Sequence, residues 1–238
     1  MGSARRTAIV AGGFFILAAV AAIVGLALYD QVLVPGYVTA VSGNDARVFG
    51  GAFSELLAAI SIIGTAVTLF PVVRKQNEAM ALGYVAGRVA EAVVIAVGII
   101  SLLAIVTLRR EAADVPAAGT AALDVIGRAL VAVHDWTFLF GPNLALGVNT
   151  LLLASLMFAS RLVPRFIAIL GLVGGPLIFA SGTAVLFGVY DQVSTWGLVT
   201  ALPVFAWEMT LAAWLIVRGF DKRQLRSSQT RALAALPA

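Results

Sequence analysis

Six long apolar runs follow one another along the chain, and the charged residues fall mainly in the short breaks between them. Each run is long enough for the about 20 residues that an α-helix needs to cross a bilayer. The runs cover residues 7–28, 48–73, 79 or 82 to 108, about 134–160, 166–187 and 196–220. The pattern therefore predicts an all-α, polytopic membrane protein built as a bundle of six transmembrane helices.

The first run follows Arg5 and Arg6, as the apolar core of a secretory signal would. It exceeds the roughly 7–15 apolar residues of such a core, so we expect a helix that the protein retains. The six spans and their loops occupy residues 1–226, which predicts a single membrane domain. The alanine-rich segment 227–238 is expected to be a short, disordered cytoplasmic tail.

Lysine and arginine are distributed unevenly between the two sides of the predicted bundle, and cytoplasmic loops are the ones that retain them. The side opposite the chain ends has only Arg47, Arg109, Arg110 and Arg128, with Glu111 and Asp114 as local partners for the arginine pair. Both termini are therefore expected to be cytoplasmic. Eleven of the sixteen basic residues lie on their side: Arg5, Arg6, Arg74, Lys75, Arg161, Arg165, Arg218, Lys222, Arg223, Arg226 and Arg231.

Two outer loops are longer than a simple connection requires. Residues 29–47 contain turn formers at Pro35-Gly36 and at 42–45, which predicts a small cap. In the second loop, Asp124 and Arg128 are four residues apart, the spacing that places two side chains on one helical face. We therefore expect the fourth helix to begin before the membrane, near Thr120.

The composition agrees with the segment pattern, because 61% of residues are hydrophobic and 12% are charged, against about 25% charged in soluble domains. The net charge of +4 comes from basic residues that flank apolar helices and form no stripe with interleaved aromatics. This arrangement indicates membrane lipids as partners and argues against nucleic acid. The pattern therefore predicts a multi-pass membrane protein.

Small residues at helical spacing predict where helices approach one another closely, since apolar lipid gives helices no hydrophobic reason to associate. Gly83 and Gly87 form one such pair, and Gly171 and Gly175 form another. Packing within the bundle is the simpler interpretation. A homo-oligomer interface is the alternative.

Charged residues inside the spans are the most informative set, because each costs about 2.5–3.5 kcal/mol near mid-membrane and so should face the bundle interior. Arg88 and Glu91 are three residues apart on one face, and Tyr84 lies four residues before Arg88. By depth, Glu91 and Glu208 both lie near mid-membrane. Arg88 is therefore expected to bridge them.

Polar residues on the fourth span extend this region. Asp135, Pro142 and Asn149 recur every seven residues, which predicts that they share a face. Glu55 lies closer to the outer edge, where it could form the mouth of an outward-opening cavity together with His134 and Asp135. The predicted ligand-binding set comprises Glu55, Tyr84, Arg88, Glu91, Asp135, Asn149, Trp207 and Glu208.

The sequence lacks the residues that several standard catalytic sites require. His134 is the only histidine and cysteine is absent, so we expect neither a metal site nor a bound cofactor. No Gly-x-Ser-x-Gly elbow occurs. Adjacent helical residues point about 100° apart, so a catalytic His134–Asp135 pair is unfavourable and a solvated interfacial histidine is expected. Glu91 and Glu208 could still perform acid–base chemistry on a lipid.

Several segments together resemble the bacterial domain-of-unknown-function family numbered 4386. They are residues 70–84 (FPVVRKQNEAMALGY), 87–91 (GRVAE), 135–142 (DWTFLFGP), 160–165 (SRLVPR) and 207–208 (WE), and so extend over almost the whole chain. The resemblance implies a small multi-helix protein of the inner (plasma) membrane of a bacterial cell. It implies no reaction and transfers no catalytic residue.

Three functional interpretations follow from the buried charges. The first is binding or transport of a small molecule or proton in a polar pocket among the second, third, fourth and sixth spans. The second is an intramembrane enzyme that acts on a lipid or isoprenoid by carboxylate acid–base chemistry. The third is a structural accessory subunit whose ion pairs only fix helix register.

Overall fold

The computed structural model describes residues 3–40, 43–112 and 117–225, and the predicted tail at 227–238 lies outside them. Throughout these residues the regular structure is helical. Six helical stretches are long and apolar enough to cross a membrane, which confirms a multi-pass helix bundle. The elements are α1 (Ser3–Leu28), η1 (Tyr37–Thr39), α2 (Asp45–Val73), α3 (Glu78–Ala112), α4 (Ala117–Leu139), η2 (Phe140–Ala145), α5 (Leu146–Ser160), α6 (Arg165–Leu186) and α7 (Thr195–Val217).

The fourth span is one long helix interrupted by a π-helical turn. It consists of α4, η2 and α5, and Pro142 lies within the turn. Proline has no backbone N–H to donate to the preceding turn, which favours the wider π geometry here. The helix begins at Ala117, close to the predicted start near Thr120. Asp124 and Arg128 lie 3.8 Å apart, as their spacing predicted.

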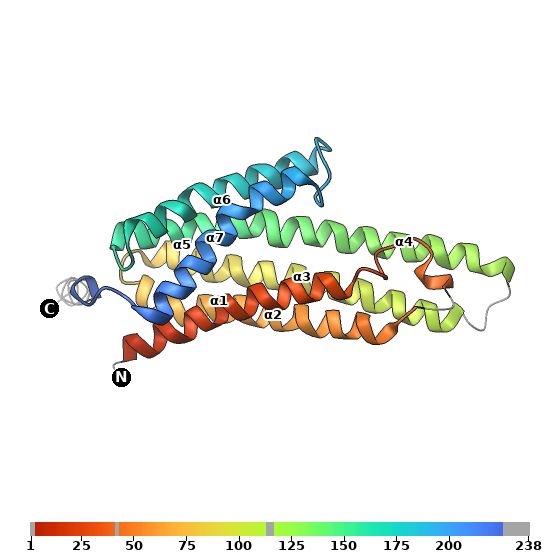
Figure 1. Cartoon of the computed structure of the whole chain (residues 1–238), viewed down its shortest axis with the longest axis horizontal. Helices are drawn as coiled ribbons and strands as arrows, with labels where there is room; N and C mark the ends of the chain where they lie inside the picture. Colours follow the sequence, from red (N-terminus) through yellow and green to blue (C-terminus); the bar gives the residue numbers. More distant parts are fainter. Residues whose placement is uncertain (1–2, 41–42, 113–116, 226–238) are drawn as a thin grey trace.

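The helices pack mainly with their sequence neighbours, and α1 closes the bundle by packing on both α2 and α7. Arg5, at the start of α1, donates a hydrogen bond of 2.9 Å to the carbonyl of Leu215 near the end of α7. The beginning of α1 and the end of α7 therefore lie at the same end of the bundle (Figure 1). At the opposite end, α2, α3 and α4 extend farther than the α6–α7 hairpin (Figure 1).

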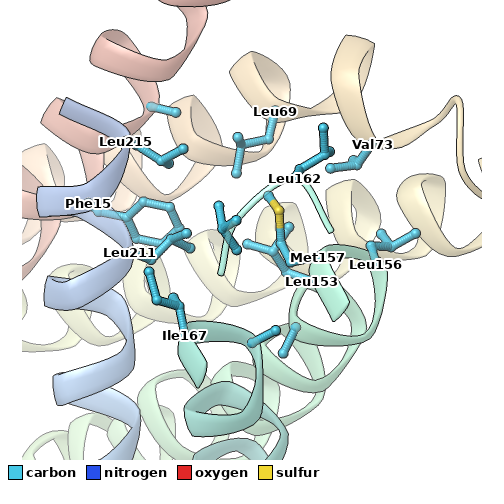
Figure 2. Packing of buried hydrophobic residues seen from close by; sticks show 14 of the residues in the cluster. Phe15, Leu69, Val73, Leu153, Leu156, Met157, Leu162, Ile167, Leu211 and Leu215 are labelled. Atoms are coloured by element: carbon cyan, nitrogen blue, oxygen red, sulfur yellow. The ribbon is translucent and has the colours of Figure 1, made fainter. Parts of the chain in front are cut away.

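The main apolar core lies at the end where α1 begins and α7 ends. Phe15 of α1, Leu69 of α2, Met157 of α5 and Leu211 of α7 point toward one another there (Figure 2). Glycines allow close approach around this core: a Cβ on Gly171 would meet the Trp207 ring at 2.6 Å. These contacts support the interpretation of Gly171 as a packing residue within the bundle.

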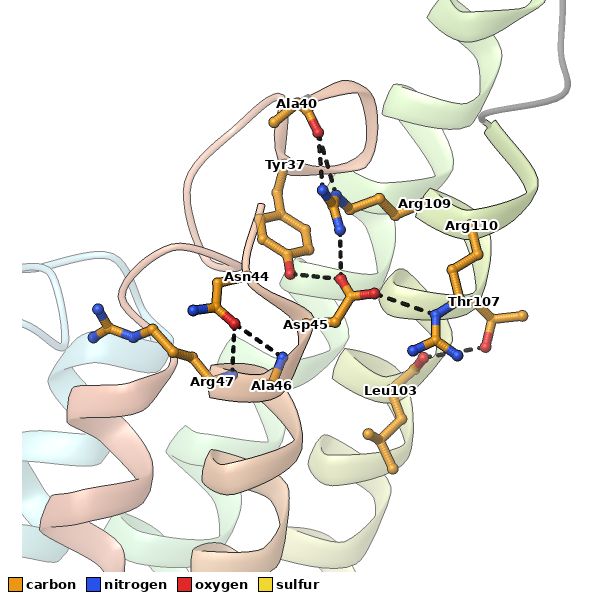
Figure 3. Close-up of polar contacts among 10 residues, drawn as sticks. All are labelled: Tyr37, Ala40, Asn44, Asp45, Ala46, Arg47, Leu103, Thr107, Arg109 and Arg110. Atoms are coloured by element: carbon orange, nitrogen blue, oxygen red, sulfur yellow. Dashed lines mark hydrogen bonds and ion pairs between the residues drawn. The ribbon is translucent and has the colours of Figure 1, made fainter. Parts of the chain in front are cut away.

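The loop at residues 29–40 and the start of α2 form a small cap held by ion pairs. Asp45 accepts hydrogen bonds from Arg109 (2.6 Å), Arg110 (3.2 Å) and the Tyr37 hydroxyl (3.2 Å) (Figure 3). Burial and the neighbouring Asp45 carboxylate raise the pKa of Tyr37. The arginine pair was expected to use Glu111 and Asp114. Asp114 lies outside the described residues, and the partner seen is Asp45, because the cap folds back over α3.

The orientation of the bundle remains a prediction, which reporter fusions can test. Fusions ending at Gln76 and at Ala238 are expected to report a cytoplasmic location, and one ending at Asn44 an exterior location, because basic residues gather at the first two positions. The measurement is reporter activity in whole cells. An opposite reading at any one of the three positions would contradict the six-span topology.

Candidate functional site

Arg88 on α3 lies at the centre of a buried charge cluster. Its Nη1 lies 3.2 Å from Oε2 of Glu91, and its Nη2 lies 2.9 Å from Oε1 of Glu208 on α7. The side chains of Arg88 and Glu91 are each 3% exposed, and that of Glu208 is 17% exposed. The predicted bridge is therefore confirmed, and Glu208 is its most accessible member.

Other predicted site residues surround this cluster. Asn149 donates a hydrogen bond of 2.7 Å to Glu91, and its side chain is buried. The guanidinium of Arg88 lies over the ring of Tyr84, with its carbon 5.5 Å from the ring centroid. Trp207 is fully buried and meets the Phe15 ring edge-on. Asn149 and Tyr84 therefore contact the charge cluster directly, whereas Trp207 contacts Phe15.

The cluster forms one end of a partly open cavity of about 260 Å³. Arg88, Glu91 and Glu208 line this cavity, and Glu55 lines it farther from the cluster, toward the start of α2. Most of the lining is apolar. Only half of the eight predicted residues are among the residues described as lining the cavity, because Tyr84, Asp135, Asn149 and Trp207 are not.

The α1 helix supplies one whole wall of the cavity, which sequence reasoning did not anticipate. Phe15, Ala18, Ala19, Ala22 and Leu26 recur on one helical face and line the space. Small residues on that face leave room where larger ones would fill it. This repeated alanine pattern was the available signal. The cost of burying charge did not mark α1, because its apolar run contains no ionisable residue.

The outer end of the cavity has its own polar group. Tyr29, just beyond α1, donates a hydrogen bond of 3.2 Å to Glu55. Burial, followed by the nearby Glu55 carboxylate, raises the pKa of the Tyr29 phenol well above its usual range. The hydroxyl therefore stays protonated and available as a donor. Tyr29 also contacts His134 edge-on, with ring centroids 5.7 Å apart.

His134 lines the cavity and is only 4% exposed, so the expectation of a solvated interfacial histidine is wrong. Tyr29 and the stacked ring of Phe138 enclose it. Its Nδ1 has no hydrogen-bond partner among the described residues, although Asp135 lies 3.5 Å away. The burial arises because the cap segment covers this part of α4, a long-range contact that a local pattern does not reveal.

Asp135 does not join the cavity lining, and its side chain is 65% exposed. The seven-residue spacing from Asp135 through Pro142 to Asn149 assumed a continuous α-helix. The π turn at Phe140–Ala145 inserts about one extra residue, which rotates the following helix by about 100° relative to that expectation. Pro142 lines the cavity, Asn149 lies behind Glu91, and Asp135 points away.

The arrangement offers polar groups but no recognisable metal centre. Across residues 3–40, 43–112 and 117–225, no three His, Cys, Asp or Glu side chains come close enough to hold a metal ion. The chemistry that these groups can supply is hydrogen bonding, charge pairing and proton exchange.

Comparison with known proteins gives one match. A family model described as "Domain of unknown function (DUF4386)" matches residues 10–219. Neither a curated protein nor a solved structure matches the chain. The matched region includes every residue of the charge cluster and the cavity.

Proposed function

The chain belongs to the DUF4386 family of domains of unknown function, and we propose that it binds, and moves, an elongated and largely apolar small molecule within the membrane. The observation that carries the proposal is the cavity of about 260 Å³ that ends at the Arg88 cluster. Ligand sites commonly combine an apolar lining with a few convergent polar groups. The proposed location is the plasma membrane of a bacterial cell.

The dimensions of the cavity support an elongated ligand. Its α1 wall extends from Phe15 to Leu26, and at 1.5 Å per helical residue this is about 16 Å. The volume is near the lower end of what small-molecule sites require. A single chain-like molecule fits these limits better than a compact polycyclic one.

A proton pathway, an enzyme and an accessory subunit would each use these residues differently. A proton pathway would use Glu55, His134 and Glu208 in series along the cavity. An enzyme would have to use Glu208 or Glu55 for acid–base work, because Glu91 is enclosed by Arg88 and Asn149. An accessory subunit, alone or as a homo-oligomer, would leave the cavity unoccupied. The apolar lining supports ligand binding over these three.

Filling the cavity tests the proposal. Ala19 lines it, whereas the adjacent Val20 is 52% exposed and does not. Ala19→Phe is expected to abolish ligand retention, because a phenyl ring would occupy the space, and Val20→Phe serves as the matched control. Each variant is purified in mild detergent, and small molecules extracted from it are compared with wild type by mass spectrometry.

The proposal expects a molecule at near-equal stoichiometry in wild type and Val20→Phe that Ala19→Phe lacks. Identical extracts from all three proteins, with Ala19→Phe folded as judged by its melting temperature, would overturn it.

A further inference from the structure

The charges around the cavity do not balance. Among the described residues that line it, Arg88 is the only lysine or arginine, and it faces Glu91 and Glu208. One positive and two negative groups leave one carboxylate without a counterion. Glu55 adds another carboxyl group nearer the outer end, where Tyr29 supplies a neutral donor. A charged group buried in the membrane normally has a partner, so the uncompensated carboxylate must take up either a proton or a cation.

The geometry identifies Glu208 as the member that can receive this cation. Glu91 is enclosed, because Arg88 and Asn149 both donate to it. Glu208 uses only Oε1 for Arg88, and within the described part of the chain its Oε2 has no hydrogen bond. Glu208 lines the cavity and is the least buried of the three. Its free oxygen is therefore accessible from the cavity.

An anionic head group fits poorly at the same place. Both terminal nitrogens of Arg88 are already engaged by carboxylates. A ligand carboxylate or phosphate would meet Glu208 and Glu91 with no unpaired lysine or arginine in the lining to offset them. Like charges in a medium of low dielectric repel strongly.

We infer that the ligand is a lipophilic cation: a protonated or quaternary amine whose head pairs with Glu208 and whose apolar chain lies along the alanine face of α1. The inference rests on the proposed function, since it names the ligand class of that site. The head lies near the Arg88 cluster, and the chain extends toward Leu26. The rings of Phe15 and Phe138 line the cavity beside the chain.

Four probes of equal chain length separate head-group charge from chain binding. Decylamine, decyltrimethylammonium, decanol and decanoate are added at equal concentration to the protein in maltoside micelles, and Tm is measured. The two cations are expected to raise the Tm of wild type by about 5 °C, because a ligand that binds only the folded state stabilises it. Decanol and decanoate are expected to give a much smaller shift.

Glu208→Gln removes the proposed counterion while its amide oxygen can still accept from Arg88. The same change at the exposed Glu78, at the start of α3, is the matched control. The cation-specific shift is expected to persist in Glu78→Gln and to disappear in Glu208→Gln.

Each outcome decides something different. A shift by decanol equal to that by the cations would overturn the cationic head while leaving chain binding in the cavity intact. No shift with any probe would overturn the proposed function as well. A cation-specific shift that Glu208→Gln keeps in full would remove Glu208 as the counterion.

Discussion

Replacing Arg88 with alanine is expected to lower the free energy of unfolding by about 3–5 kcal/mol, the loss typical when one partner of a buried ion pair is removed. The reason is that Glu91, at 3% exposure, and Glu208 would both lose their cation. Arg88 also covers the rings of Tyr84 and Phe15. The measurement is a thermal or denaturant unfolding curve of the purified protein in micelles, with a drop in Tm of about 10 °C.

Two further variants make the Arg88 result specific. Arg110→Ala removes an arginine that also pairs with a carboxylate but is 61% exposed, and it should cost under about 1 kcal/mol. Changing Arg88 and Glu91 together to leucine should recover much of the loss, because the more deeply buried carboxylate is then removed with its cation. Glu208 remains, but its side chain is 17% exposed. Arg88→Ala with the stability of Arg110→Ala would contradict the buried cluster.

A methyl group at Gly174 is expected to destabilise the α6–α7 contact by about 1–3 kcal/mol, as overpacking does in other tightly packed cores. An added Cβ would lie 2.8 Å from the backbone nitrogen of Val204 and 3.0 Å from the carbonyl carbon of Pro203. Backbone atoms cannot rotate aside, so the two helices would have to separate. Unfolding of Gly174→Ala in micelles measures this loss.

Gly13 provides the matched control on α1. A Cβ there has nothing within 4 Å, and alanine favours a helix more than glycine does. Gly13→Ala should therefore be as stable as wild type or more so. Equal stability of the two variants would show that α6 and α7 do not approach as closely as described.

Much of the fold was predictable from the sequence because the membrane restricts which backbone structures can cross it. Lipid offers no partners to backbone polar groups, so each span must be one long apolar helix with charges at its ends. Charged residues are costly inside the membrane, so Arg88, Glu91 and Glu208 stood out in the sequence. Their positions, counted in residues from the ends of their spans, were enough to predict that they pair. The spacing of Asp124 and Arg128 likewise indicated the early start of α4.

The remaining features depend on contacts between distant segments. His134 is buried because Tyr29 reaches it from the end of α1, and no local pattern indicates this. Asp45 became the partner of Arg109 and Arg110 because the cap folds onto α3. The exposure of Asp135 follows from the π turn around Pro142, which breaks the helical count.

An experimental structure of the protein in a lipid bilayer tests the central claim most directly. The account predicts an elongated density along the alanine face of α1, ending beside Oε2 of Glu208, with Arg88 between Glu91 and Glu208. A structure in which α1 packs directly on α3 and fills the cavity, or in which the Arg88 guanidinium points to lipid head groups away from both carboxylates, would contradict it.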